Sequence, residues 1–159
     1  MRRTGLAICA LVLVATAPTS PWSLQKKVDP ISDAGSVSLS LKRGSLLLLL
    51  QCDSQDAEPF SITVGKENTY LGGRPIIRPT IVRFDKNAPK TQQWGYSGYF
   101  SVAQEGQRQT IASIATSRLL AIRLQDGRGT PIDLVYDLAG ASAQVSNFKK
   151  ACSSLGMNL

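Results

Sequence analysis

The sequence predicts a mainly β fold with a C-terminal α-helix, arranged as an antiparallel sandwich or an open barrel. Short segments of alternating apolar and polar residues recur along the chain, and turn-forming residues separate them. The last stretch has helical periodicity instead. We expect seven or eight strands, one short internal helix and the terminal helix. The length of 159 residues suits a single domain, which we place at residues 18–159.

Residues 1–17 have the pattern of a signal peptide. Arg2 and Arg3 form a positively charged start, and an apolar core runs from Leu6 to Val14. Ala15 to Ala17 has the small-x-small form of a signal-peptidase site, and the prolines that follow leave the position of the cut open. The apolar run is too short to cross a bilayer as a stable helix. We therefore expect a periplasmic or secreted protein of a Gram-negative bacterium, with no stable membrane span after cleavage.

Two cysteines remain after cleavage, Cys52 and Cys152, because Cys9 lies in the leader. An even pair in an exported chain predicts a disulfide, and two buried free thiols are the alternative. The bond would close a loop of 100 residues. In the chain-entropy model such a loop stabilises the folded state by up to about 4.7 kcal/mol.

The charge balance is modestly basic. Without Arg2 and Arg3 the chain has 16 basic and 11 acidic residues, a net charge of +5. The basic residues are scattered and form no cluster interleaved with aromatic residues, so we expect no nucleic-acid partner. The excess favours an acidic partner or envelope surface, or serves solubility alone.

The first part of the chain predicts three strands. Trp22 to Val28 alternates roughly, and the turn formers of Asp29 to Gly35 end it. Val37 to Leu41 alternates apolar residues with serine, which is typical of a half-buried strand. The leucine run Leu46 to Leu50 favours a central strand buried on both faces, with a helix as the competing interpretation. Cys52 would then lie at the end of this strand.

Prolines constrain the middle of the chain. Phe60 to Val64 is a short predicted strand, and the loop Gly65 to Gly73 follows it. Ile76 to Asp85 reads as extended, but Pro75 and Pro79 restrict it to a sheet edge or a bulge.

A stretch of aromatic residues and glycines is the best candidate for a binding surface. A period-two pattern places four residues on one face: Trp94, Tyr96, Phe100 and Val102. The alternative, which we favour for the aromatic residues of this set, is that they belong to the core. Tyr99 is then the exposed member of the stretch.

Arg83 and Asp85 complete the candidate surface. They are two residues apart on a predicted strand and therefore share a face. A surface ion pair is the plainer interpretation, and such a pair is worth under about 1 kcal/mol.

The C-terminal part predicts a short helix from Arg108 to Ser117, followed by strands at Leu119 to Leu124 and Pro131 to Tyr136. Gln125 to Gly129 is a strong turn signal between the two strands.

The terminal helix carries one apolar stripe. Six residues follow each other at helical spacing: Leu138, Ala141, Val145, Phe148, Cys152 and Leu155. Asp137 or Ser142 would cap its start, and Gly156 stands where a left-handed C-terminal cap is expected. Cys152 therefore points at whatever the helix packs on.

Catalytic chemistry has few candidate residues. The chain contains no histidine, which excludes Ser-His-Asp and Cys-His nucleophile systems and removes the commonest zinc ligand. If Cys52 and Cys152 are bridged, no thiolate remains to bind a metal. We expect no catalytic residues, no metal and no cofactor.

The order of several motifs resembles that of a known family. The segments that carry the resemblance are Trp22, Asp29 to Asp33, Val37 to Leu41, Cys52, Val82 to Asp85, Trp94, Ile111 to Leu124, Tyr136 to Gly140 and Cys152. The chain resembles small periplasmic proteins associated with type VI secretion, of the VasI or TagO type. The resemblance implies a non-enzymatic envelope accessory protein, supports the bridge between the two cysteines, and implies a structural role for Arg83 and Asp85.

These observations predict a domain that acts by binding a protein partner in the cell envelope. The alternative function is an inhibitor of a periplasmic or foreign hydrolase, either a wall-degrading enzyme or a protease. An inhibitor would present one rigid loop, and Gly65 to Gly73 or Lys86 to Gln93 are the candidates.

Overall fold

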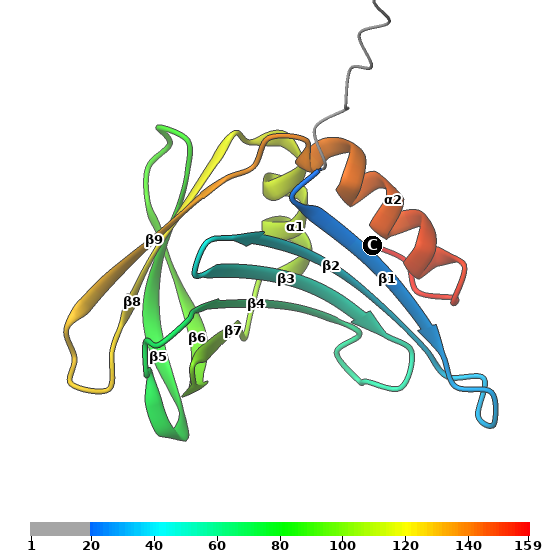
Figure 1. Cartoon of the computed structure of the whole chain (residues 1–159), viewed down its shortest axis with the longest axis horizontal. Coiled ribbons are helices and arrows are strands. Elements are labelled where there is room, and N and C mark those ends of the chain that lie inside the picture. Colours follow the sequence, from blue (N-terminus) through cyan, green and yellow to red (C-terminus); the bar gives the residue numbers. More distant parts are fainter. Residues whose placement is uncertain (1–19) are drawn as a thin grey trace, which may run out of the picture.

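The computed structural model describes residues 20–159, so the predicted signal peptide lies outside the described residues. Nine strands form one antiparallel sheet in the order β1-β2-β3-β4-β7-β6-β5-β8-β9. The sheet curls into a half-barrel (Figure 1). The strands are β1 Trp22–Val28, β2 Gly35–Arg43, β3 Leu46–Asp53, β4 Phe60–Lys66, β5 Gly72–Phe84, β6 Lys90–Gly98, β7 Phe100–Ala103, β8 Leu119–Gln125 and β9 Pro131–Asp137. The predicted open, mainly antiparallel β fold is confirmed.

Two helices cover one face of the sheet. α1 (Gln107–Thr116) contacts β4 and α2, while α2 (Ala141–Ser153) lies along β1 and β2 (Figure 1). Period-two alternation in β2 sends Val37, Leu39 and Leu41 into this interface, where all three are fully buried. The serines between them point to the opposite, outer face, which no described helix covers.

The disulfide between Cys52 and Cys152 is present and joins β3 to α2. The two Cα atoms are 6.2 Å apart, and both residues are fully buried. The predicted stripe of α2 is buried at Val145 and Phe148 as well. The helix thus packs on the inner leucine rows, as its periodicity indicated.

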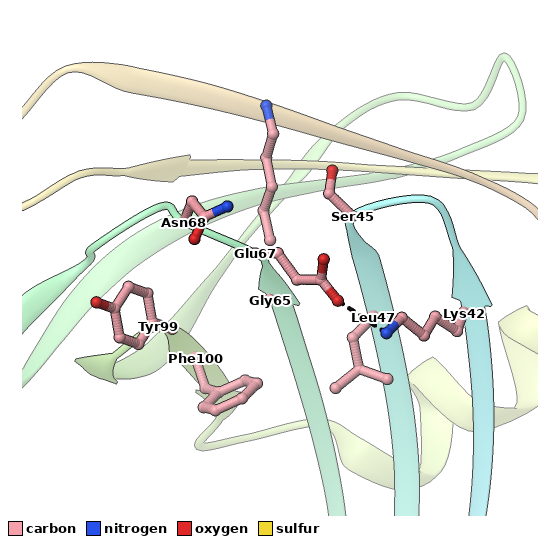
Figure 2. Close-up of a pocket in the computed structure, with 9 residues that line it drawn as sticks. Lys42, Ser45, Leu47, Gly65, Glu67, Asn68, Tyr99 and Phe100 are labelled. Carbon is pink, nitrogen blue, oxygen red and sulfur yellow. Dashed lines mark ion pairs between the residues drawn. The ribbon is translucent and has the colours of Figure 1, made fainter.

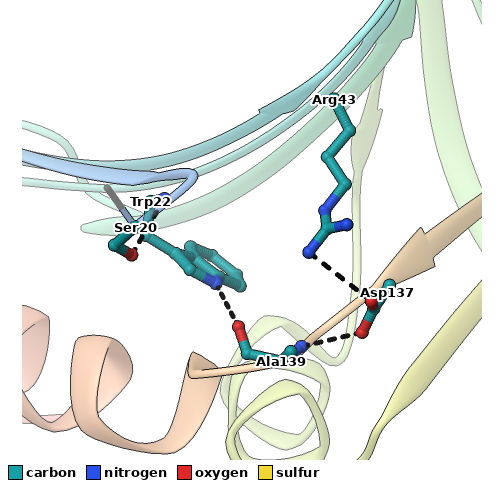
Figure 3. Close-up of polar contacts among 5 residues, drawn as sticks. All are labelled: Ser20, Trp22, Arg43, Asp137 and Ala139. Atoms are coloured by element: carbon teal, nitrogen blue, oxygen red, sulfur yellow. Dashed lines mark hydrogen bonds and ion pairs between the residues drawn. The ribbon is translucent and has the colours of Figure 1, made fainter. Parts of the chain in front are cut away.

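The start of α2 differs from the expectation of a side-chain cap. Gly140, with φ of 80°, occupies the N-cap position, and neither Asp137 nor Ser142 caps the helix. The Asp137 carboxylate instead accepts a hydrogen bond from the Ala139 N–H, at 3.0 Å. The indole N–H of Trp22 donates to the Ala139 carbonyl at 3.0 Å, which ties β1 to the same turn (Figure 3). Tertiary contacts therefore hold this helix start.

Two polar contacts hold β9 against the β2–β3 hairpin. The Tyr136 hydroxyl donates to the Leu47 carbonyl at 2.9 Å, and Arg43 lies 3.5 Å from Asp137 (Figure 3). Burial raises the pKa of the Tyr136 hydroxyl, so this donor stays protonated. The contacts hold the far end of the sheet beside the β2–β3 hairpin, although β9 does not pair with β1.

The leucine strand is central, as predicted, but only one of its faces is buried. Leu48 and Leu50 have no exposed surface, whereas Leu47 and Leu49 are half-buried on the outer face. The expectation of burial on both faces is wrong because both helices pack on the same side of the sheet.

The expected shared face of Trp94, Tyr96, Phe100 and Val102 is also wrong. Ser97 pairs with Phe100 across a two-residue turn, so inward positions continue at Ser101 and Ala103. Phe100 and Val102 point outward instead. A turn of two residues changes the parity of the alternation, which a continuous period-two reading overlooks.

The prolines of β5 fit the predicted constraint. The pairing register shifts between Gly72 and Ile76, around Pro75. β8 pairs only with Ile81–Phe84, so the preceding part of β5, including Pro79, has a partner strand on one side alone. Proline is tolerated at such positions because no ladder hydrogen bond is lost.

Removing the disulfide should destabilise the domain strongly. We expect the double variant Cys52→Ala, Cys152→Ala to lose about 3–5 kcal/mol in free energy of unfolding, because the bond closes a loop of 100 residues. Urea denaturation of the wild type and the variant measures the difference. A loss below about 1 kcal/mol would contradict a stabilising role for the bond.

Candidate functional site

A groove of about 520 Å³ lies on the outer face, where the β2–β3 turn, the end of β4 and the β6–β7 turn meet (Figure 2). Its apolar lining comes from Leu47, Tyr99 and Phe100. Lys42 and Glu67 contribute charged groups to the same lining. A concave surface that combines aromatic rings with a few polar groups is the usual form of a ligand site. We refer to it as the aromatic groove.

Exposed aromatic rings surround the aromatic groove. Tyr99 is 50% exposed and Phe100 is 46% exposed, and Tyr70 beside them is 51% exposed. The rings of Tyr70 and Tyr99 meet edge to face, with centroids 5.8 Å apart. Three large rings thus gather at one end of the sheet without being covered by the core.

Two glycines leave room for these rings. A Cβ atom at Gly65 would lie 2.8 Å from the Phe100 ring and 2.9 Å from the Tyr99 carbonyl. A Cβ atom at Gly73 would lie 2.6 Å from the Tyr70 hydroxyl. The Phe100 ring therefore rests directly on the backbone of β4.

Backbone hydrogen bonds hold the connection between β4 and β5 in place. The Glu67 N–H donates to the Ser45 carbonyl at 2.8 Å, and the Leu71 N–H donates to the Gly98 carbonyl at 2.7 Å. The Gly127 N–H donates to the Tyr70 carbonyl at 3.2 Å. These contacts join three hairpins and preorganise the rings of the groove.

The charged side chains of the groove are partly paired. Lys42 Nζ lies 2.8 Å from Glu67 Oε1 (Figure 2). Both side chains are more than half exposed, so the pair contributes under about 1 kcal/mol to stability. Its effect is to hold the two groups side by side at the rim.

A second hollow of about 480 Å³ adjoins the aromatic groove. Asn68 lines both, and Tyr70, Asp126 and Arg128 line the second. The Asp126 carboxylate accepts hydrogen bonds from the N–H groups of Thr130 and Arg128, each at 2.8 Å, and these lower its pKa. The two hollows therefore meet at Asn68, and we refer to the pair of them as the track.

Trp94 and Tyr96 do not belong to this surface. Both are fully buried, as the core alternative expected. The Trp94 indole N–H donates to Gln92, and the Tyr96 hydroxyl lies 2.7 Å from Thr80 Oγ1. Their place in the candidate binding surface is therefore corrected. Tyr99 has the exposed position that the core alternative predicts for it.

Arg83 and Asp85 lie away from the aromatic groove and form no ion pair within residues 20–159. Asp85 Oδ1 accepts hydrogen bonds from the Arg118 and Leu119 N–H groups, at 2.9 and 2.8 Å. These bonds lower the pKa of the Asp85 carboxyl, the one from Leu119 most. Asp85 thus fixes the start of β8, which is a structural function.

Sequence reasoning missed most of the groove. Tyr70 lies inside a loop that the sequence suggests only as an inhibitor loop, and the period-two pattern places Phe100 on the same face as the buried Trp94 and Tyr96. Lys42 and Glu67 carry no motif. The available signal is Gly98, which directly precedes Tyr99 and Phe100 in the β6–β7 turn. Gly65 meets the Phe100 ring only in the folded chain.

No protein-family model matches the chain, and neither the curated proteins nor the solved structures compared with it include a significant match. Within residues 20–159 there is no group of three or more acidic, cysteine or histidine side chains placed to hold a metal ion. No helix in that range is long and apolar enough to span a membrane. The chemistry that the described residues offer at the groove is ring stacking, hydrogen bonding and charge pairing.

Gly65→Ala tests whether the groove floor requires glycine. We expect a loss of about 1–3 kcal/mol in free energy of unfolding, because the methyl group would press on a backbone carbonyl that cannot move easily. Gly95→Ala is the matched control, since its methyl group would press on the flexible end of the Gln104 side chain and would touch the Val102 carbonyl at an ordinary 3.8 Å. Equal losses in the two variants would contradict the close packing at Gly65.

Asp85→Asn tests the carboxylate at the start of β8. Because the folded pKa is lowered, the ionised form stabilises the fold above the ordinary value of 3.8, and this stabilisation is lost as pH falls through the folded pKa. We expect the free energy of unfolding of the variant to fall less steeply than that of the wild type below pH 3.8. Urea titrations at several pH values measure this, and parallel curves would refute the assignment.

Proposed function

We propose that the protein is a non-enzymatic binding protein of the cell envelope and that the aromatic groove is its binding site. The observation that carries the proposal is the cluster of half-exposed rings, Tyr70, Tyr99 and Phe100, around a groove with a charged rim. Large exposed aromatic side chains supply most of the binding free energy at recognition sites. The hydrogen bonds that fix the surrounding turns reduce the entropy lost on binding.

The location in the envelope is supported by the leader-like start and by the disulfide. The bond between Cys52 and Cys152 is consistent with an exported chain, because disulfides persist in oxidising compartments. Within this proposal, the resemblance to type VI secretion-associated proteins makes an accessory function at a secretion apparatus the specific hypothesis.

Inhibition of a hydrolase is the second candidate function. The observation that favours it is the connection between β4 and β5, which presents Tyr70 outward and is held by neighbouring hairpins. A rigid, exposed loop is what insertion into an active site requires. Purified wall hydrolases and proteases should then lose activity when the protein is added at equimolar concentration.

Envelope retention tests the proposed function. The full chain, produced with a tag in a Gram-negative host, should sediment with the envelope fraction, and Tyr99→Ala should lower the retained share by about fivefold or more. Ile31→Ala is the control, because Ile31 is 93% exposed in the β1–β2 turn, at the opposite end of β2. Retention that is equal in the wild type and Tyr99→Ala would refute the groove as the binding site.

A further inference from the structure

We propose that the aromatic groove and the adjoining hollow bind a linear glycan that carries carboxylate groups. This inference rests on the proposed function, because it names the ligand class of the same site. Four features of the track support it: its aromatic rings, its polar side chains, its cations without an ion pair in the described residues, and a backbone that has no free strand edge.

The rings supply faces for sugar units. Pyranose sugars present C–H groups on their flat faces, and these pack on the electron-rich faces of aromatic rings. Tyr99 and Phe100 line the groove, and Tyr70 lines the hollow that adjoins it at Asn68. A chain of several sugar units can therefore contact rings at more than one point along the track.

Polar side chains lie beside the rings. Ser45 and Asn68 line the groove, and Asn68 also lines the second hollow (Figure 2). A hydroxyl and an amide both donate and accept hydrogen bonds, which matches the hydroxyl and acetamido groups of sugars. Asn68 lies at the junction, where a continuous chain would have to pass.

The charges of the track favour an acidic ligand. Glu67 is paired with Lys42, and Oδ1 of Asp126 accepts hydrogen bonds from two backbone N–H groups. Lys66 lines the groove and Arg128 lines the hollow, and neither forms an ion pair with the residues that the structure describes. Each of the two hollows therefore contributes one such cation, with which a carboxylate of the ligand can pair.

The backbone at the groove offers no free strand edge. β4 pairs with β3 on one side, and at Thr63–Gly65 it pairs with β7 on the other. The N–H groups of Glu67, Thr69 and Leu71 are also bonded. A peptide that adds a strand to a sheet therefore has no site here, and recognition must use side chains.

Calorimetric titration with defined oligosaccharides tests the inference. The protein, purified with its disulfide intact, is titrated with a hexasaccharide of alternating glucuronate and N-acetylglucosamine, and separately with the neutral N-acetylglucosamine hexamer. We expect the acidic oligosaccharide to bind more tightly. Tyr99→Ala should weaken its binding by about tenfold or more, while Tyr99→Phe, which keeps the ring, should stay within about twofold.

A further variant tests whether the positive charge of the groove gives the preference for the acidic oligosaccharide. Lys66→Gln should weaken binding of the acidic oligosaccharide and reduce its advantage over the neutral one, and Ile31→Ala should change neither. Circular dichroism confirms that each variant is folded. No binding of the acidic oligosaccharide, a neutral one that binds equally well, or binding that survives Tyr99→Ala would overturn the inference.

The two tests fail independently. Envelope retention that depends on Tyr99, together with no binding of either oligosaccharide, would overturn the glycan inference and leave a protein as the partner. Oligosaccharide binding that depends on Tyr99, without envelope retention, would overturn the proposed function and leave the ligand class standing.

Discussion

Burial of a single face of the nine-stranded sheet is the constraint on which the rest of the structure depends. Only α1 and α2 are present in residues 20–159 to cover that face, so the sheet curls around them. The Cys52–Cys152 bond fixes α2 to the sheet. The outer face receives no helix within the described range. Half-exposed leucines and rings therefore remain on that side, and it is the side on which a binding surface can form.

The position of the aromatic groove follows from the curl. Contacts from Tyr136 to Leu47 and from Arg43 to Asp137 bring the last strand beside the β2–β3 hairpin. The β7 strand joins β4, although the chain between them runs through β5 and β6. Turns that are distant in sequence thus meet at one end of the half-barrel, and Tyr99 lies among them.

Local patterns in the sequence predicted most of the elements, because alternation, turn chemistry and helical spacing are properties of short segments. The disulfide was predicted from cysteine number and from the inward direction of Cys152. The predicted face or burial of a side chain was wrong where it depends on a turn or on an element distant in the sequence. Phe100 faces outward because a two-residue turn changes the parity, and Leu47 is half-buried because no helix lies over it. The contact of Tyr70 with Tyr99 depends on how two hairpins meet, which no local pattern contains.

The groove region departs from what stability alone favours. Glycine within a strand costs about 0.5–1 kcal/mol relative to alanine, yet Gly65 and Gly73 both leave space for aromatic rings. The rings themselves remain about half exposed, so each contributes only part of the folding free energy that full burial of an aromatic side chain provides. Such concentrated departures from good packing are expected where a surface is shaped for a ligand. The same residues would be a poor choice for a surface that only has to remain folded.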